Sequence, residues 1–281
     1  MNIRVLKIFV AMSVVSLKPS IPDEIDGETM YANATLRDSV HCRGYIPRTT
    51  DKTIVKVCDM HSEGKKKFLR EKDITVRAGE MGIGPLTYSF DVNDDYGYIF
   101  MHRLDIKLQD VLVGLDRLDR HRCDDASCDS RIDDISKLSD KFFLKLVHLE
   151  GKWHSYMIDG FKNLRRNFFK LAEETGAYHA DMHGGNIMFD FGHKENESDV
   201  AAVFARPYMI DYGNIIEAPT DPNDWNAGVE AFVYGETVIL HSPEEAFERS
   251  ILDVVELIDS YVTDRSVAEQ MFAALGVESP N

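Results

Sequence analysis

The clearest periodic pattern in the chain lies over residues 156–174. Its apolar residues recur at steps of three or four positions: Ile158, Phe161, Leu164, Phe168 and Leu171. This spacing puts them on one stripe of an α-helix, so we expect a core helix whose end is marked by Gly176. A second helical pattern, over residues 243–275, is expected to close the C-terminal part of the fold.

A strand pattern precedes these helices. Residues 53–57 read Thr-Ile-Val-Lys-Val, a β-branched run that predicts a strand with Lys56 on the side opposite Val55 and Val57. Residues 67–74, which include Glu71, predict a helix that begins near Gly64 and ends in a Gly- and Pro-containing turn over residues 80–85. Residues 97–105 predict a further strand and the connection that follows it.

Two short strands are expected later in the chain. The first covers residues 187–189 and its partner covers residues 207–210, with an acidic, polar loop at residues 193–199 between them. The sequence Asp190-Phe191-Gly192 follows the first strand too closely for a second strand and turn to intervene. We therefore interpret Asp190 as a strand-end residue.

Polar residues gather around these two strands. The loop before the first strand reads His179-Ala180-Asp181-Met182-His183-Gly184-Gly185-Asn186, and the second strand is followed by Asp211-Tyr212-Gly213. An Asp and an Asn five positions apart on a tight loop can place a carboxylate near an attacking hydroxyl and an amide oxygen near a metal. A second Asp before a turn can hold Mg²⁺ against phosphates.

Together these motifs resemble the protein-kinase-like superfamily. The segment from His179 to Asn186 is similar to its catalytic loop, and Asp211-Tyr212-Gly213 is similar to its metal-binding Asp-Phe-Gly. Lys56 stands where the family has its ATP-binding lysine, and Glu71 stands where it has the acid that pairs with that lysine. The resemblance implies an α+β, bilobal fold, with a strand-rich N-lobe carrying one main helix and an abbreviated, mainly helical C-lobe.

The resemblance also implies roles and cofactors, ATP and Mg²⁺. Lys56 would contact the α- and β-phosphates and Glu71 would orient it, whereas the alternatives are an exposed strand lysine and an ordinary surface carboxylate. Asp181 would position the acceptor hydroxyl and take its proton, while Asn186 and Asp211 would coordinate the metal. His183 has two open roles: neutralising the transferred phosphoryl group, or hydrogen-bonding within the loop.

The expected adenine site lies in residues 97–105. Met101 would guard the back of the pocket, and the backbone of His102 and Leu104 would hydrogen-bond adenine. The family's Gly-rich phosphate loop has no match before Lys56, and Gly27 with its small and polar neighbours is the candidate replacement.

The motifs indicate ATP chemistry more closely than they indicate an acceptor. The leading interpretation is a minimal Ser/Thr protein kinase, of a viral or microbial kind, with a protein substrate. The loop with His183 is also similar to those of aminoglycoside and choline kinases, so a small-molecule acceptor is the alternative. A pseudokinase that only binds partners is the third hypothesis, motivated by the missing Gly-rich loop.

Net charge and cysteine content restrict the expected partners, compartment and thiol state of the protein. The net charge of −16 disfavours nucleic acid and anionic membranes as partners. The apolar run at residues 8–17 is too short to cross a bilayer as a helix, and the need for ATP favours the cytoplasm, or a host cytoplasm, over secretion. Four cysteines are too few for a disulfide framework, so we expect reduced thiols, and Cys123 with Cys128 lacks the further ligands of a zinc site.

The expected domain organisation has three parts. Residues 1–20 form an apolar N-terminal segment, residues 21–101 the N-lobe, and residues 102–281 the hinge and C-lobe. Within the last part, the acidic stretch near residues 114–140 is interpreted as an insertion, a loop able to bind a partner.

Overall fold

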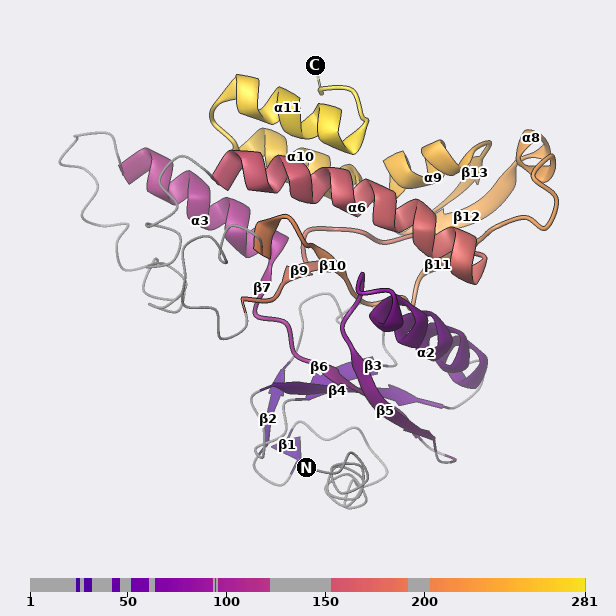
Figure 1. Ribbon diagram of the computed structural model, residues 1–281. Helices are drawn as coiled ribbons and strands as arrows, with labels where there is room; N and C mark the ends of the chain where they lie inside the picture. Colours follow the sequence, from indigo (N-terminus) through magenta and orange to yellow (C-terminus); the bar gives the residue numbers. More distant parts are fainter. Residues whose placement is uncertain are drawn as a thin grey trace. The chain divides into compact units, whose positions relative to one another are not determined.

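The fold is a mixed α/β arrangement of helices and antiparallel sheets (Figure 1). The computed structural model describes residues 24–25, 28–31, 42–45, 52–60, 64–92, 94, 96–121, 153–191 and 203–280. The chain divides into two compact units, Met1–Arg103 and Leu104–Asn281.

The described strands of the first unit form an antiparallel sheet. Its strand order is β1-β2-β3-β4-β6-β5, and helix α2 (Gly64–Glu80) packs on β4, β5 and β6. The strands are β1 (Glu24–Ile25), β2 (Glu28–Tyr31), β3 (Cys42–Tyr45), β4 (Thr53–Asp59), β5 (Thr87–Val92) and β6 (Tyr96–His102). The strand predicted at residues 53–57 is confirmed as β4, and the helix predicted at residues 67–74 is the middle of the longer α2.

A close approach between Phe68 and Gly97 sets how α2 lies on this sheet. A Cβ added to Gly97 of β6 would lie 2.6 Å from Cζ of Phe68, so the ring occupies the space that glycine leaves. Phe68 is only 2% exposed and packs with Cys58, Met60 and Ile99 in an apolar cluster. Gly97 therefore allows the helix to approach the sheet at this point.

The cysteine expectation is wrong for one pair. Cys42 and Cys58 form a disulfide between β3 and β4, where they stand directly opposite each other in the antiparallel register. Directly opposite residues on adjacent antiparallel strands have close Cβ atoms, which favours a cross-link. The number of cysteines in the sequence does not reveal this disulfide, because the pairing depends on the register of β3 and β4. Cys123 and Cys128 lie outside the described residues.

The second unit is centred on helix α6 (Trp153–Thr175), which confirms the helix predicted over residues 156–174. Helix α11 packs along it, and α10 packs on α3 (Figure 1). The periodic C-terminal segment is helical as predicted, and it is divided into α9, α10 and α11. Among the residues that the structure describes, the labelled helices of this unit besides α6 are α3 (Leu108–His121), α8 (Asp224–Ala227), α9 (Pro243–Ser250), α10 (Leu252–Tyr261) and α11 (Arg265–Leu275).

The described part of this unit also contains three small antiparallel sheets. They join β9 to β10 and β7, β8 to β11, and β12 to β13. The predicted pairing of residues 187–189 with residues 207–210 is confirmed by the β9 and β10 pair. The strands are β7 (Ile106–Lys107), β8 (Ala177–His179), β9 (Ile187–Phe189), β10 (Tyr208–Met209), β11 (Ile215–Glu217), β12 (Val229–Val233) and β13 (Glu236–Leu240).

Some expectations fall outside the described residues. These are the N-terminal segment at residues 1–20, Gly27 and the acidic loop at residues 193–199. The proposed insertion is described only to His121, and that part continues helix α3, so residues 114–121 are not a loop. Over the part of the chain that is described, no helix combines the length and apolar character needed to cross a membrane.

Candidate active site

In the first unit, Lys56 and Glu71 form a buried ion pair. Nζ of Lys56 donates to Oε1 of Glu71, and the two residues are 8% and 4% exposed. Lys56 lies on β4, flanked by Gly44 of β3 and Ile99 of β6, whereas Glu71 comes from α2. Both surface alternatives, an exposed strand lysine and a helix-surface carboxylate, are therefore wrong.

The predicted adenine-binding residues lie at the end of β6. Met101 packs on the apolar cluster around Phe68, and the backbone N–H of His102 donates to the carbonyl of Leu86 at 2.8 Å. The imidazole Nδ1 of His102 lies 3.0 Å from the hydroxyl of Tyr88. Because the His102 N–H is already bonded, the donor to a purine would have to come from another residue. Leu104 is the first residue of the second unit.

In the second unit, His179 connects the two polar segments. Its Nε2 donates to the carbonyl of Ile210 at 2.8 Å, and its Nδ1 accepts from the backbone N–H of Asp181 at 3.1 Å. These two bonds require the neutral imidazole with the proton on Nε2. His179 is fully buried, and burial lowers its pKa, which favours the same neutral form. The side chain thus fixes Asp181 relative to the residue before Asp211.

Asn186 is held in the same network. Its Nδ2 donates to the carbonyl of Asp181 at 2.9 Å, its backbone N–H donates to the carbonyl of His183, and its own carbonyl accepts from the N–H of Ile210. The side chain is 1% exposed, and its Oδ1 has no hydrogen-bond partner among the described residues. A buried amide oxygen without a donor is costly, and a hard cation would satisfy it.

Asp211 stands directly after this connection with an unusual backbone. Its φ is 61°, in the left-handed region that non-glycine residues rarely adopt. The next residue, Tyr212, is 1% exposed, donates from its hydroxyl to the carbonyl of Met209 and packs its ring against His179 at 5.1 Å. The buried Tyr212 therefore anchors a strained turn that sets the position of Asp211.

The rest of the loop is fixed by the helices around it. The N–H of Gly184 donates to Asp253 of α10 at 2.8 Å, and its carbonyl accepts from the N–H of Gln109 of α3 at 3.1 Å. A Cβ at Gly184 would lie 2.3 Å from Cδ1 of Leu257 and 3.2 Å from Cβ of Gln109, so a larger residue would force the Leu257 side chain to move. Nδ1 of His183 accepts from the N–H of Gly185 at 2.9 Å, so His183 does hydrogen-bond within the loop.

Tyr234 is a neighbour that the sequence did not predict. It lies in the turn between β12 and β13 with a φ of 49°, and its hydroxyl donates to the carbonyl of Ser250. Burial raises the pKa of Tyr234, and the carboxylates of Asp181 and Asp253 raise it further. The negative charge of Asp181 therefore acts on the hydroxyl of Tyr234. The positive φ follows from a tight turn, but nothing in the local pattern links that turn to residue 181.

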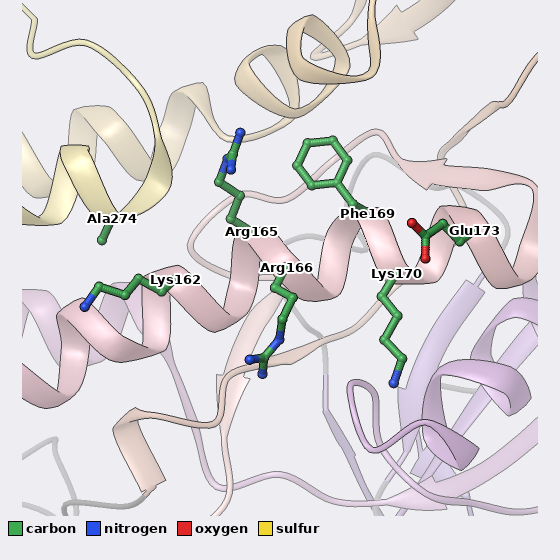
Figure 2. Close-up of a pocket in the computed structure, with 7 residues that line it drawn as sticks. All are labelled: Lys162, Arg165, Arg166, Phe169, Lys170, Glu173 and Ala274. Carbon is green, nitrogen blue, oxygen red and sulfur yellow. The ribbon is translucent and has the colours of Figure 1, made fainter. Parts of the chain in front are cut away.

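A separate pocket of about 590 Å³ lies along α6 (Figure 2). Its lining includes one carboxylate, that of Glu173, and four cationic side chains: Lys162, Arg165, Arg166 and Lys170. The guanidinium of Arg165 stacks over Phe169 at 5.3 Å. None of the predicted site residues lines this pocket, so it is a locally basic surface distinct from the polar network around His179.

Each unit thus carries part of the predicted set. The first brings Lys56 and Glu71 together, and the second brings Asp181, Asn186 and the segment leading to Asp211 together through His179. The oxygen donors of Asn186 and Asp211 are the kind that Mg²⁺ prefers, and the unpaired Oδ1 of Asn186 fits such a ligand. His179 and Asp253, for which the sequence predicts no role, hold the loop.

No protein-family model and no curated protein sequence matches this chain. Among solved structures, the chain is similar to a medium-resolution structure of the bifunctional kinase-methyltransferase WbdD, with a TM-score of 0.36 and 16% identity over 69% of this chain and 34% of that one. A high-resolution structure of WbdD gives a TM-score of 0.35 and 14% identity over 67% and 33% of the two chains. The chain therefore spans about a third of the length of these proteins.

Proposed function

We propose that this protein is an ATP- and Mg²⁺-dependent phosphotransferase of the protein-kinase-like superfamily that acts on Ser and Thr hydroxyls of proteins. In this proposal residues 21–101 are the N-lobe and residues 102–281 the hinge and C-lobe. The observation that carries the proposal is the buried Oδ1 of Asn186, which has no donor among the described residues while its Nδ2 is bonded to the carbonyl of Asp181. A hard cation bound at this oxygen would supply the partner that it lacks among the described residues.

The roles follow from where each side chain is held. The ammonium of Lys56, oriented by Glu71, would bind the phosphates, and the carboxylate of Asp181 would orient the acceptor hydroxyl and accept its proton. Asn186 and Asp211 would hold Mg²⁺, which neutralises charge on the phosphates of ATP. His179 is a positioning residue, because it touches Asp181 and Ile210 through hydrogen bonds.

The Lys56 and Glu71 pair supports the same proposal. Bringing a lysine and a glutamate into the interior costs several kcal/mol for each ion, so an ion pair there is weak evidence for stability alone. Binding of ATP phosphates by Lys56 would explain why a lysine and its partner are kept at this buried position.

The acceptor is tested by a transfer screen. Purified protein is incubated with Mg²⁺ and γ-labelled ATP, in parallel with mixed unphosphorylated proteins, amino sugars and choline. We expect label on Ser and Thr of the proteins, and none when the Asp181→Asn variant replaces the wild type. Label only in a small molecule would overturn the protein-kinase assignment in favour of the aminoglycoside or choline kinase type. Absence of label in every arm would favour a pseudokinase.

A further inference from the structure

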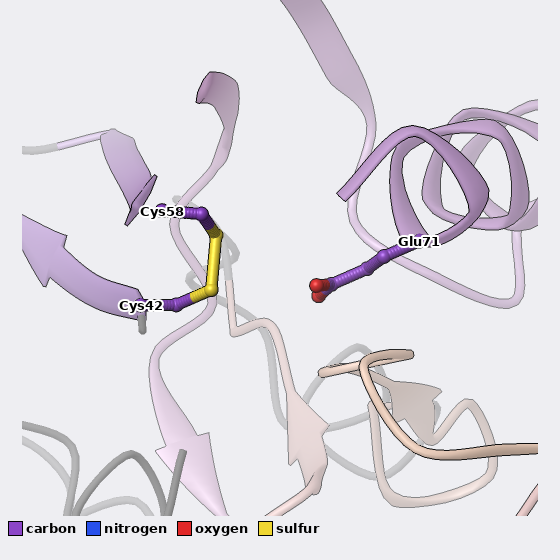
Figure 3. Close-up of side chains that lie close together, drawn as sticks. All are labelled: Cys42, Cys58 and Glu71. Atoms are coloured by element: carbon purple, nitrogen blue, oxygen red, sulfur yellow. A yellow bond between two sulfur atoms is a disulfide. The ribbon is translucent and has the colours of Figure 1, made fainter. Parts of the chain in front are cut away.

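Three potential metal ligands meet in the first unit. The sulfur atoms of Cys42 and Cys58 and a carboxylate oxygen of Glu71 all lie within 4.8 Å of one another. Figure 3 shows the carboxylate of Glu71 pointing from α2 toward the disulfide. The sequence predicts no phosphoryl-transfer role for the two cysteines, whereas Glu71 is the predicted partner of Lys56.

The three groups come from three different elements, β3, β4 and α2. Cys42 and Cys58 are paired across β3 and β4, and Glu71 projects from α2, which packs on β4. Cys58 and Glu71 are 1% and 4% exposed, and Cys42 is half-buried. Phe68, Met60 and Ile99 pack with the two cysteines, and the ion pair with Lys56 holds the carboxylate of Glu71.

We propose that reduction of the Cys42–Cys58 disulfide creates a site where both thiolates and the Glu71 carboxylate bind one Zn²⁺ ion. A dithiol supplies the two electrons: it becomes a cyclic disulfide, and the S–S bond of the protein becomes two thiols. Each thiol then loses its proton to solvent as its sulfur binds the metal. Two sulfur ligands select Zn²⁺ over Mg²⁺ or Ca²⁺, which prefer oxygen.

Charge balance supports a divalent ion at this position. Two thiolates and one carboxylate bring three negative charges into a buried cluster, and Lys56, which is bonded to Glu71, supplies one positive charge. A divalent cation makes the sum over these four groups zero, and buried charges in proteins are paired with opposite ones or bound to metals. Three protein ligands leave a fourth tetrahedral position open.

The inference goes beyond the proposed function, since it requires neither ATP nor an acceptor. The proposed zinc site and the proposed kinase function share one residue, Glu71, because metal binding and the ion pair with Lys56 both use its carboxylate. A kinase that fails the transfer screen can still bind Zn²⁺ here, and an active kinase can fail to bind it.

The test uses Co²⁺ as a coloured substitute for Zn²⁺. The full chain carries Cys123→Ser and Cys128→Ser, is reduced with dithiothreitol, freed of the reductant under anaerobic conditions and titrated with Co²⁺. We expect one ion per chain, a thiolate-to-cobalt charge-transfer band, loss of the band on adding Zn²⁺, and no band in the oxidised protein. Reduced protein that takes up no Co²⁺ overturns the proposal.

Variants identify the ligands. Cys58→Ser is expected to abolish the charge-transfer band or halve its intensity, and Glu71→Gln to weaken Co²⁺ binding at least about tenfold. Glu80→Gln, the same change at an exposed position of α2, is the matched control and should bind as the parent does. Circular dichroism of each metal-free variant separates loss of a ligand from loss of the fold. Unchanged affinity in Glu71→Gln would contradict the three-ligand site even if the cysteine variant loses the band.

Discussion

Nδ2 of Asn186 donates to the backbone carbonyl of Asp181 at 2.9 Å, which leaves Oδ1 of the same amide buried without a donor among the described residues. The bond fixes which end of the amide is turned away from Asp181. An unsatisfied buried oxygen costs about 1–3 kcal/mol. A ligand that binds this oxygen would remove that cost.

The first prediction concerns this oxygen. Asn186→Leu should abolish the rise in Tm that Mg²⁺ and ATP together produce in the wild type, because a ligand stabilises only the protein that binds it. Differential scanning fluorimetry measures the shift. Asn163→Leu is the matched control: Asn163 also donates from Nδ2 to a backbone carbonyl, that of Ala205, outside the loop. A retained shift in Asn186→Leu would remove Asn186 from the metal site.

The Lys56 and Glu71 pair makes a second prediction. Lys56→Met should lower the free energy of unfolding by about 3–5 kcal/mol, because Glu71 remains as a buried charge. The double variant Lys56→Met/Glu71→Leu should lose less than Lys56→Met alone. Urea denaturation of the wild type and both variants measures these free energies. Lys162→Met, in an exposed pair with Asp159, should cost less than about 1 kcal/mol. Equal costs at positions 56 and 162 would contradict the buried pair.

Gly97 provides a third prediction. Gly97→Ala should destabilise the protein by about 1–3 kcal/mol, because its Cβ would overlap the ring of Phe68. In the double variant Gly97→Ala/Phe68→Leu, the smaller side chain makes room, so the cost should fall below the sum of the single costs. Strict additivity in urea denaturation would show that the two residues do not compete for space.

The fourth prediction is a pH dependence from His179. Burial lowers its pKa below the ordinary 6.5, so below that pH the unfolded state binds a proton that the folded state does not. Its contribution to stability is therefore complete above pH 6.5 and is lost as the pH falls toward the lowered folded pKa. His179→Gln, which cannot titrate, should show a shallower loss of stability below pH 6.5 in urea denaturation. Parallel curves for the two proteins would contradict this.

The sequence predicted those helices and strands whose apolar periodicity lies within a single segment. Helix α6 follows from its apolar stripe, and β9 with β10 follows from two short apolar runs around a polar loop. Asp190 follows β9 directly, as its spacing indicates. These features depend on neighbours in sequence, which is why periodicity and turn residues reveal them.

The features that escaped prediction depend on long-range register. The Cys42–Cys58 disulfide needs the alignment of β3 with β4, and the contact of Phe68 with Gly97 needs the docking of α2 on β6. Tyr234 approaches Asp181 only because the chain returns after more than fifty residues of sequence. Neither strand alternation nor residue type contains that information.

Comparison of Asp181→Asn with Asp211→Asn tests the central claim most directly. The quantities measured are Mg²⁺-dependent binding of ATP and transfer of its γ-phosphate to protein. We predict that Asp181→Asn binds ATP as the wild type does and transfers phosphate about 10²–10⁴-fold more slowly, whereas Asp211→Asn loses the Mg²⁺-dependent part of binding. Wild-type rates in both variants, or equal loss of binding in both, would contradict the roles assigned to these two carboxylates.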